Sequence, residues 1–139
     1  MRQSIRILLV DDDPDLIRLF WMILAKEGFE VMTAFDGRLG LEEVHAIQPD
    51  LILLDVMMPD GLDGIEVCRQ VRADPALHQV RVIMVSAKGD DETRLAAFNA
   101  GADDYWVKPI SRTSLVDRVR AALEARRGGA ARSMTNPAG

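Results

Sequence analysis

Short apolar runs alternate with amphipathic segments along almost the whole chain, and this alternation constrains the fold more than any other feature. Three runs are β-branched and aliphatic and are typical of strands, and two further runs are shorter and weaker. Continuous apolar runs of this kind are typical of strands buried on both faces of a parallel sheet. The predicted strands are Ile5–Val10, Glu30–Ala34, Leu51–Leu54, Val80–Val85 and Tyr105–Val107.

A helical pattern follows each predicted strand. In the first, apolar residues recur every three or four positions, with Asp13 and Pro14 as a start signal and Gly28 as a stop signal. Because right-handed crossovers place helices on both faces of such a sheet, the order predicts an α/β fold, a doubly wound five-stranded parallel sheet with five helices. The later helices are marked by Leu41, Val44 and Ile47; by Ile65, Cys68 and Val71, with Asp63 as cap; by Leu95 and Phe98 before Gly101; and by Leu115, Val119 and Leu123 before Gly128 and Gly129.

The length of 139 residues suits one domain, which we place at residues 1–127. Residues 128–139 are rich in small residues, and we expect a flexible, disordered tail there. Cys68 is the only cysteine, so no internal disulfide can form, and its helical position predicts a small buried side chain.

The net charge is −5, and the only charged residues after Glu124 are Arg126, Arg127 and Arg132. An acidic body lacks the basic stripe of nucleic-acid-binding domains, so we expect no direct nucleic-acid binding by this domain. The N-terminus has no signal-peptide pattern, and no apolar run is long enough to span a membrane. The sequence therefore predicts a cytoplasmic protein without a membrane segment.

Polar side chains follow four of the predicted strands at the point where each strand ends. Asp11 and Asp12 follow the first strand, Asp55 the third, Ser86 the fourth and Lys108 the fifth. An isolated Asp in such a place is usually a turn or cap residue, and an isolated Ser is usually a satisfied loop hydroxyl. Because ligands of doubly wound sheets bind at the carboxyl ends of the strands, the joint arrival of polar groups from four strands indicates a site.

Three carboxylates in one pocket resist ionising together, and a hard divalent cation resolves that conflict. Carboxylate oxygens together with phosphate oxygens suit Mg²⁺. Asp55 is then the nucleophile that accepts a phosphoryl group, with Lys108 and the Ser86 hydroxyl binding the phosphoryl oxygens. Asp13 is interpreted first as a helix cap and only remotely as a metal-site residue.

Four stretches together resemble the receiver domain of two-component response regulators, of the CheY-like kind. They are ILLVDDD (7–13), LILLDVMMPD (51–60), VIMVSAK (82–88) and GADDYWVKP (101–109). The resemblance implies a flavodoxin-like fold with strand order 2-1-3-4-5. It also implies that Asp55 is the phosphoacceptor, that Asp11 and Asp12 are the metal-binding acids, and that the backbone carbonyl of Met57 is a further metal ligand.

The same resemblance assigns a switch. Ser86 and Tyr105 correspond to the switch residues, Lys108 to the phosphate-binding lysine, and the peptide bond before Pro109 is expected to be cis. Phosphorylation would draw the Ser86 hydroxyl toward the phosphoryl group and let Tyr105 turn inward, which changes the surface of the fourth helix, fifth strand and fifth helix. The other reading of Tyr105 is a simple core aromatic. The candidate surface residues are Lys88, Arg94, Asp103, Asp104, Arg112 and Arg118.

The implied partners are a sensor histidine kinase or a phosphotransfer protein that donates from a phosphohistidine, and a second copy of the chain bound through that surface. We expect a signalling switch and not an enzyme. The sequence departs from the family pattern in its loop after Pro59, which is one residue longer than usual before Asp63 and Gly64, and in the bulky Trp106. The side chain of Trp106 should point to the opposite side of the strand from Tyr105.

Three other functions remain open. The first is a phosphatase-like hydrolase with an aspartyl-phosphate intermediate, because Asp11 and Asp13 have the spacing of its two acids. That reading leaves Asp55 without a role, and Pro14 starts a helix at once. The second is a receiver that binds partners without being phosphorylated. The third is a flavin carrier, although no Ser/Thr/Gly-rich phosphate loop follows the first strand.

Overall fold

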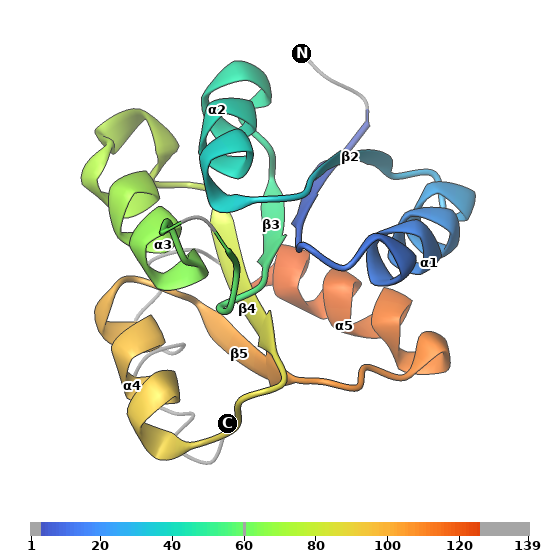
Figure 1. Ribbon diagram of the computed structural model, residues 1–139. Coiled ribbons are helices and arrows are strands. Elements are labelled where there is room, and N and C mark those ends of the chain that lie inside the picture. The colour runs from blue at the N-terminus through green and yellow to red at the C-terminus, as the bar shows by residue number, and fades with distance from the viewer. Residues whose placement is uncertain (1–3, 60, 126–139) are drawn as a thin grey trace.

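The computed structural model describes residues 4–59 and 61–125, in which five strands alternate with five α-helices (Figure 1). The elements are β1 (Arg6–Val10), α1 (Pro14–Lys26), β2 (Glu30–Ala34), α2 (Gly37–Ile47), β3 (Leu51–Leu54), α3 (Gly64–Ala73), the short 3₁₀ helix η1 (Pro75–Leu77), β4 (Arg81–Ser86), α4 (Asp91–Asn99), β5 (Asp104–Val107) and α5 (Arg112–Glu124). The predicted alternation is therefore confirmed, with strand ends that differ by at most one residue.

All five strands are parallel and lie in the order β2-β1-β3-β4-β5, as predicted. Figure 1 shows α1 and α5 on one side of the sheet and α2, α3 and α4 on the other. Two apolar clusters match this division. One joins Val44, Val67 and Ala97 to the sheet, and the other joins Phe20 and Leu115 to its opposite face. The doubly wound architecture thus buries β3 completely and buries β1 and β4 except for Arg6 and Arg81, their first residues.

Each helix begins at a polar side chain that accepts a backbone N–H of its first turn. Asp13 accepts from the N–H groups of Asp15 and Leu16, so it is the predicted cap of α1. Asp63 accepts from Glu66 at the start of α3, as expected. The caps of the other three helices are Asp36, Asp90 and Ser111.

The predicted fourth helix is confirmed as α4, which ends before Gly101. Leu95 and Phe98, which mark it in the sequence, are nevertheless 62% and 40% exposed, and its buried residue is Ala97. Ala97 is thus the small buried side chain through which the middle of α4 packs on the core. At the far end of the chain, α5 ends at Glu124, and the predicted stop signal at Gly128 and Gly129 lies outside the described residues, as does the predicted tail.

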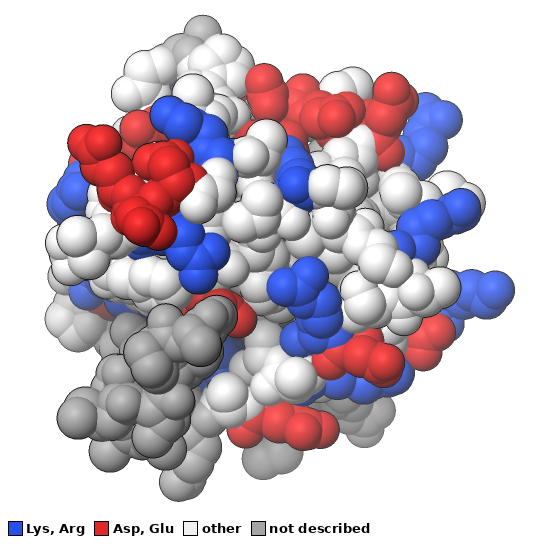
Figure 2. All heavy atoms as spheres, turned by 90° about the horizontal axis from the view of Figure 1, so that it is seen from below, with Lys and Arg blue, Asp and Glu red and all other residues white. Residues whose placement is uncertain are grey.

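No helix in the described part of the chain has both the length and the apolar composition needed to cross a membrane. Figure 2 looks at the molecule from below the view of Figure 1, the side toward which β4 and β5 run. Acidic and basic side chains are interspersed on that face rather than gathered into one field of a single sign. The strand ends that carry the predicted site open toward this mixed surface.

Candidate functional site

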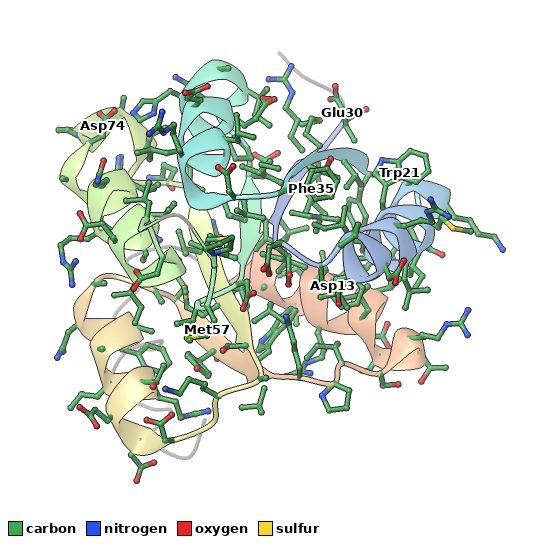
Figure 3. The ribbon with its side chains drawn as sticks, in the orientation of Figure 1. Asp13, Trp21, Glu30, Phe35, Met57 and Asp74 are labelled. Carbon is green, nitrogen blue, oxygen red and sulfur yellow. The ribbon has the colours of Figure 1, made fainter. Side chains whose placement is uncertain are left out.

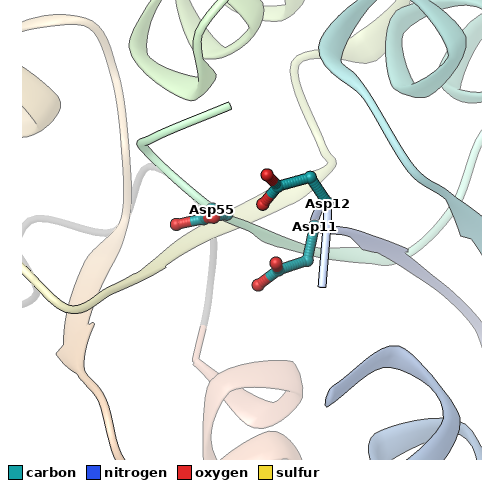
Figure 4. Close-up of side chains that lie close together, drawn as sticks. All are labelled: Asp11, Asp12 and Asp55. Atoms are coloured by element: carbon teal, nitrogen blue, oxygen red, sulfur yellow. The ribbon is translucent and has the colours of Figure 1, made fainter. Parts of the chain in front are cut away.

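Three carboxylates meet at the carboxyl edge of the sheet (Figure 4). Asp11 and Asp12 follow β1, and Asp55 follows β3, the strand paired with β1. One oxygen from each lies within 4.8 Å of the others, and among the described residues this is the cluster that could hold a metal ion. Asp11 and Asp55 are buried, whereas Asp12 is exposed. Oxygen ligands from three acids fit a hard cation such as Mg²⁺.

Lys108 brings a single positive charge to these acids. Its Nζ donates to Asp11 Oδ2 at 2.9 Å and lies 3.7 Å from Asp55 Oδ2. Burial acts to lower the pKa of Lys108, but the hydrogen bond and the charges of Asp11 and Asp55 outweigh it, so the pKa is raised. One lysine facing three carboxylates leaves the cluster negatively charged, which favours a divalent cation in the pocket.

Asp55 has the perturbed pKa of the cluster. Burial first, and then the charge of Asp11, raise the pKa of Asp55 from 3.8 to about 6, although Lys108 and the Met57 N–H act in the opposite direction. A carboxylate poised near neutrality, with a cationic partner and inside an acidic cluster, is a physical signature of a functional group.

The loop after β3 borders the acids on the other side. Met57 donates its N–H to Asp55 Oδ1 at 3.4 Å, and its side chain is exposed. In Figure 3, Met57 and Asp13 lie on either side of the centre of the molecule, in the loops that flank the site. Gly64, the first residue of α3, packs directly on the phosphoacceptor candidate, because a Cβ there would lie 2.0 Å from the Asp55 carbonyl oxygen. The start of α3 thus touches the backbone of Asp55.

Ser86 and Tyr105 meet at the backbone of one residue, Lys88. The fully buried Ser86 hydroxyl accepts from the Lys88 N–H at 3.1 Å, and the Tyr105 hydroxyl donates to the Lys88 carbonyl. Tyr105 is buried, and the guanidinium of Arg94 lies 5.2 Å from its ring centroid. Sequence reasoning did not find the role of Lys88, because both contacts are to its main chain and its side-chain type carries no signal for them.

Two further features, in β5 and the loop after it, have the geometry that the sequence predicts. The Lys108–Pro109 peptide bond is cis. Trp106 packs into the cluster of α1 and α5, whereas Tyr105 packs into the opposite one, as the alternation of a strand requires. The Trp106 indole donates to Asp104 Oδ2 at 3.0 Å and lies 4.5 Å from the guanidinium of Arg118.

Asp103 was wrongly expected at the surface. Its side chain is 4% exposed and pairs with Arg72 of α3, with Arg72 Nη2 at 2.7 Å from Asp103 Oδ2. The same oxygen accepts from the Val82 N–H at 2.9 Å. The pair lies 31 residues apart in sequence, so no local pattern could have revealed it.

Comparison with protein families gives one match that covers most of the described chain. A family described as the response regulator receiver domain matches residues 7–120. Among curated proteins, the DNA-binding response regulator MtrA of Mycolicibacterium smegmatis is 46% identical over 123 residues, which is 88% of this chain and 51% of that protein. The transcriptional regulatory protein ResD of Bacillus subtilis is 45% identical over 118 residues, which is 85% of this chain and 48% of that protein. The chain thus spans about half the length of these relatives.

Solved structures agree with this result. A putative response regulator from Chloroflexus aurantiacus is 34% identical with a TM-score of 0.81, over 88% of this chain and all of that one. The Vibrio cholerae chemotaxis protein CheY4 is 27% identical with a TM-score of 0.80, over 86% of this chain and 98% of that one. Both likenesses cover the sheet and its helices together.

Proposed function

Because the chain belongs to the response regulator receiver domain family of two-component systems, we propose that Asp55 accepts a phosphoryl group from the phosphohistidine of a sensor histidine kinase or a phosphotransfer protein. The observation that carries this proposal is the convergence of Asp11, Asp12 and Asp55 within 4.8 Å, with Lys108 Nζ at 3.7 Å from Asp55. An ionised Asp55 oxygen attacks phosphorus, the phosphorus–nitrogen bond breaks, and the departing imidazole takes up a proton.

Asp11, Asp12 and Asp55 would hold a Mg²⁺ ion, with the Met57 carbonyl as a further ligand. The donor set fits, because the acids are oxygen ligands whose charge one lysine does not balance. Bound there, the ion neutralises charge on the phosphoryl oxygens. The chain itself supplies Lys108 as a second positive charge and the Ser86 hydroxyl as a hydrogen-bond donor to the phosphoryl group. In this proposal the Ser86 hydroxyl moves toward the phosphoryl group and away from the Lys88 N–H, from which it accepts in this structure.

The switch would then act through Lys88. Ser86 and Tyr105 contact the N–H and the carbonyl of this one residue, which belong to the two successive peptide units on either side of its Cα. Movement of the Ser86 hydroxyl therefore frees the unit before Lys88 while Tyr105 still holds the unit after it. Lys88 precedes α4, whose exposed Leu95 and Phe98 offer apolar surface. We place the changed surface on α4, β5 and α5.

A second copy of the chain is the proposed occupant of that surface. Exposed Leu95 and Val107 supply apolar contacts, and Asp104 and Arg118 supply one charge of each sign, which suits a self-complementary twofold interface. Light scattering with and without beryllofluoride and Mg²⁺ tests this assembly. Dimer formation only with beryllofluoride is expected, and a monomer under both conditions would contradict it.

The proposed phosphorylation is tested by incubating the protein with acetyl phosphate and Mg²⁺ and measuring its intact mass. We expect the addition of one phosphoryl group, its loss in Asp55→Asn, and its retention in the matched control Asp63→Asn, which keeps a capping side chain at the start of α3. An unchanged mass, while a known receiver domain is labelled in parallel, would refute the proposal.

We further propose that the protein is a switch and not an enzyme. The hydrolase alternative needs Asp13 as its second acid, but Asp13 accepts from two N–H groups of α1 as its cap. An assay with a chromogenic phosphomonoester and Mg²⁺ distinguishes the two, since a switch shows no sustained turnover. Steady release of product that depends on Asp11 and Asp13 would establish the hydrolase instead.

A further inference from the structure

The ion pair between Arg72 and Asp103 lies at the opposite edge of the sheet from the acid cluster. Both side chains are largely buried, at 12% and 4% exposure, and they connect the last turn of α3 to the loop before β5. Asp103 contacts Val82, the second residue of β4, so the pair sits where β4 and β5 begin. The proposed phosphorylation chemistry does not use either residue.

Asp103 forms two hydrogen bonds with the main chain of Val82. The Asp103 N–H donates to the Val82 carbonyl at 2.8 Å, and Asp103 Oδ2 accepts from the Val82 N–H at 2.9 Å. A single residue thus satisfies both main-chain groups of Val82 on this side. Because the next residue, Asp104, is the first of β5, these two hydrogen bonds fix where β5 starts along β4.

Arg72 holds the Asp103 carboxylate in that position. Its Nη2 donates to Asp103 Oδ2 at 2.7 Å, and its Nε donates to the Gly101 carbonyl at 2.8 Å. Gly101 has φ of 110°, and a Cβ there would lie 2.3 Å from Arg72 Cγ, so the loop is shaped around the arginine. The planar guanidinium binds two points of the loop at once, which a lysine cannot do.

β5 needs such an external anchor. It has four residues, lies at the edge of the sheet, and pairs only with β4. Its two faces are both apolar, with Tyr105 packed on the α4 side and Trp106 on the α5 side. A slip of one residue would exchange these faces and move Tyr105 away from Lys88. Buried ion pairs contribute little net stability over apolar residues, and setting a register is their best-attested use.

We propose that Arg72 is a positioning residue, which sets the register of β5 through Asp103 and thereby places Tyr105 and Lys108 at the phosphorylation site. The inference rests on the proposed function, because it concerns the geometry of the same site. Helix α3 connects the two edges: Gly64 packs on the Asp55 carbonyl, and Arg72 lies at the other end of a helix of about 15 Å. The acceptor and the strand that carries Lys108 are thus positioned by one helix.

The test uses the indole N–H signals of ¹⁵N-labelled protein. The chain has two tryptophans, so a Trp21→Phe background leaves Trp106 of β5 as the single indole reporter. In this parent, beryllofluoride with Mg²⁺ is expected to shift the Trp106 signal. Arg72→Met should displace or split that signal before any addition, reduce the shift to less than half, and slow phosphorylation by acetyl phosphate at least fivefold. Arg69→Met, which removes an exposed guanidinium from the same helix, should match the parent.

A merely structural role predicts otherwise. If Arg72 has only a structural role, Arg72→Met should have a lower unfolding midpoint, but its Trp106 signal, the shift of that signal and the phosphorylation rate of the folded protein should equal the parent values. That result would overturn the inference. If Arg72→Met does not fold, Arg72→Lys and Asp103→Asn decide, since each keeps part of the contact: intermediate signals and rates support the inference, and parent values refute it. A parent that takes up no phosphoryl group refutes the proposed function itself, which the intact mass reveals first.

Discussion

Two buried charge clusters of this domain differ in their balance. At the carboxyl edge of the sheet, three carboxylates face one lysine, and the pKa of Asp55 is raised to about 6. At the opposite edge, Arg72 pairs one to one with Asp103, and both carry further hydrogen bonds to backbone. The first cluster is left with excess negative charge at neutral pH, whereas the charges of the second balance each other within the protein.

The difference shows that buried charges affect the free energy of unfolding in opposite directions, depending on whether a partner balances them. An unbalanced cluster costs folding free energy that is recovered on binding, whereas an intact balanced pair contributes little net stability and becomes strongly destabilising when one partner is removed. Removing an acid should therefore stabilise the protein at one edge and destabilise it at the other. Four predictions follow this contrast.

The largest effect is expected from breaking the balanced pair. Arg72→Met leaves Asp103 buried without its cationic partner, which costs about 3–5 kcal/mol. Urea unfolding at neutral pH measures this loss as a lower midpoint with an unchanged slope. A loss below about 1 kcal/mol would show that the two edges do not differ as described, because that is the cost of an exposed pair.

Removing charge from the unbalanced cluster should have the opposite sign. The pKa of Asp55 lies above its unfolded value, so the fold favours the protonated acid. Ionising Asp55 in the folded protein therefore costs folding free energy. This cost is absent below about pH 4, grows as the pH rises to about 6, and is complete above that. Metal-free Asp55→Asn should thus be more stable than the parent by about 1–3 kcal/mol at pH 7.5 and by much less at pH 4.5.

Unfolding midpoints at the two pH values check this sign. Asp63→Asn is the matched control, because it removes a carboxylate from an exposed cap that accepts from the Glu66 N–H. A destabilised Asp55→Asn at pH 7.5 would mean that Lys108 outweighs burial and Asp11 in setting the free energy of Asp55.

A bound divalent cation should offset the folding free energy that the unbalanced acids cost, and it should act at the carboxyl edge of the sheet alone. At ten times its dissociation constant, Mg²⁺ should stabilise the protein by about 1.4 kcal/mol, since it binds the folded state. Asp12→Asn removes an exposed ligand and should lose most of this gain, whereas Arg72→Lys should keep it. An equal gain in Asp12→Asn would place the ion elsewhere, and thermal unfolding with and without EDTA reports the outcome.

The smallest effect belongs to an ion pair that is not buried. Arg69 and Glu66 pair three residues apart on the surface of α3, with side chains 58% and 39% exposed. Arg69→Met should change the unfolding free energy by less than about 0.5 kcal/mol. A larger change would mean that charge on α3 matters by itself, which would weaken the contrast drawn for Arg72 on the same helix.

The acid cluster could be predicted from the sequence because its residues follow strands directly. Once Leu51–Leu54 is identified as a buried strand beside Arg6–Val10, Asp55 must lie near Asp11 and Asp12. Lys108 follows from the same rule at β5. Each of these inferences uses a local pattern and the common direction of parallel strands.

The rest depended on contacts that no local pattern encodes. Asp103 stands beside Asp104 in the sequence and looks equally exposed, yet Arg72 and Val82 bury it. Leu95 and Phe98 have helical spacing, but α4 packs on the core through Ala97 and leaves both of these side chains exposed. Periodicity identifies an apolar face and does not say whether the core or a partner covers it.

The meeting of Ser86 and Tyr105 on the main chain of Lys88 has a consequence for how such a domain diversifies. Because both hydroxyls contact peptide atoms, the side chain at position 88 can vary without altering either contact. The main chain of Lys88 thus carries both hydroxyl contacts, and its side chain takes no part in them. The proposed switch, which would act through these main-chain atoms, thus leaves the side chain of Lys88 available for contacts with a partner.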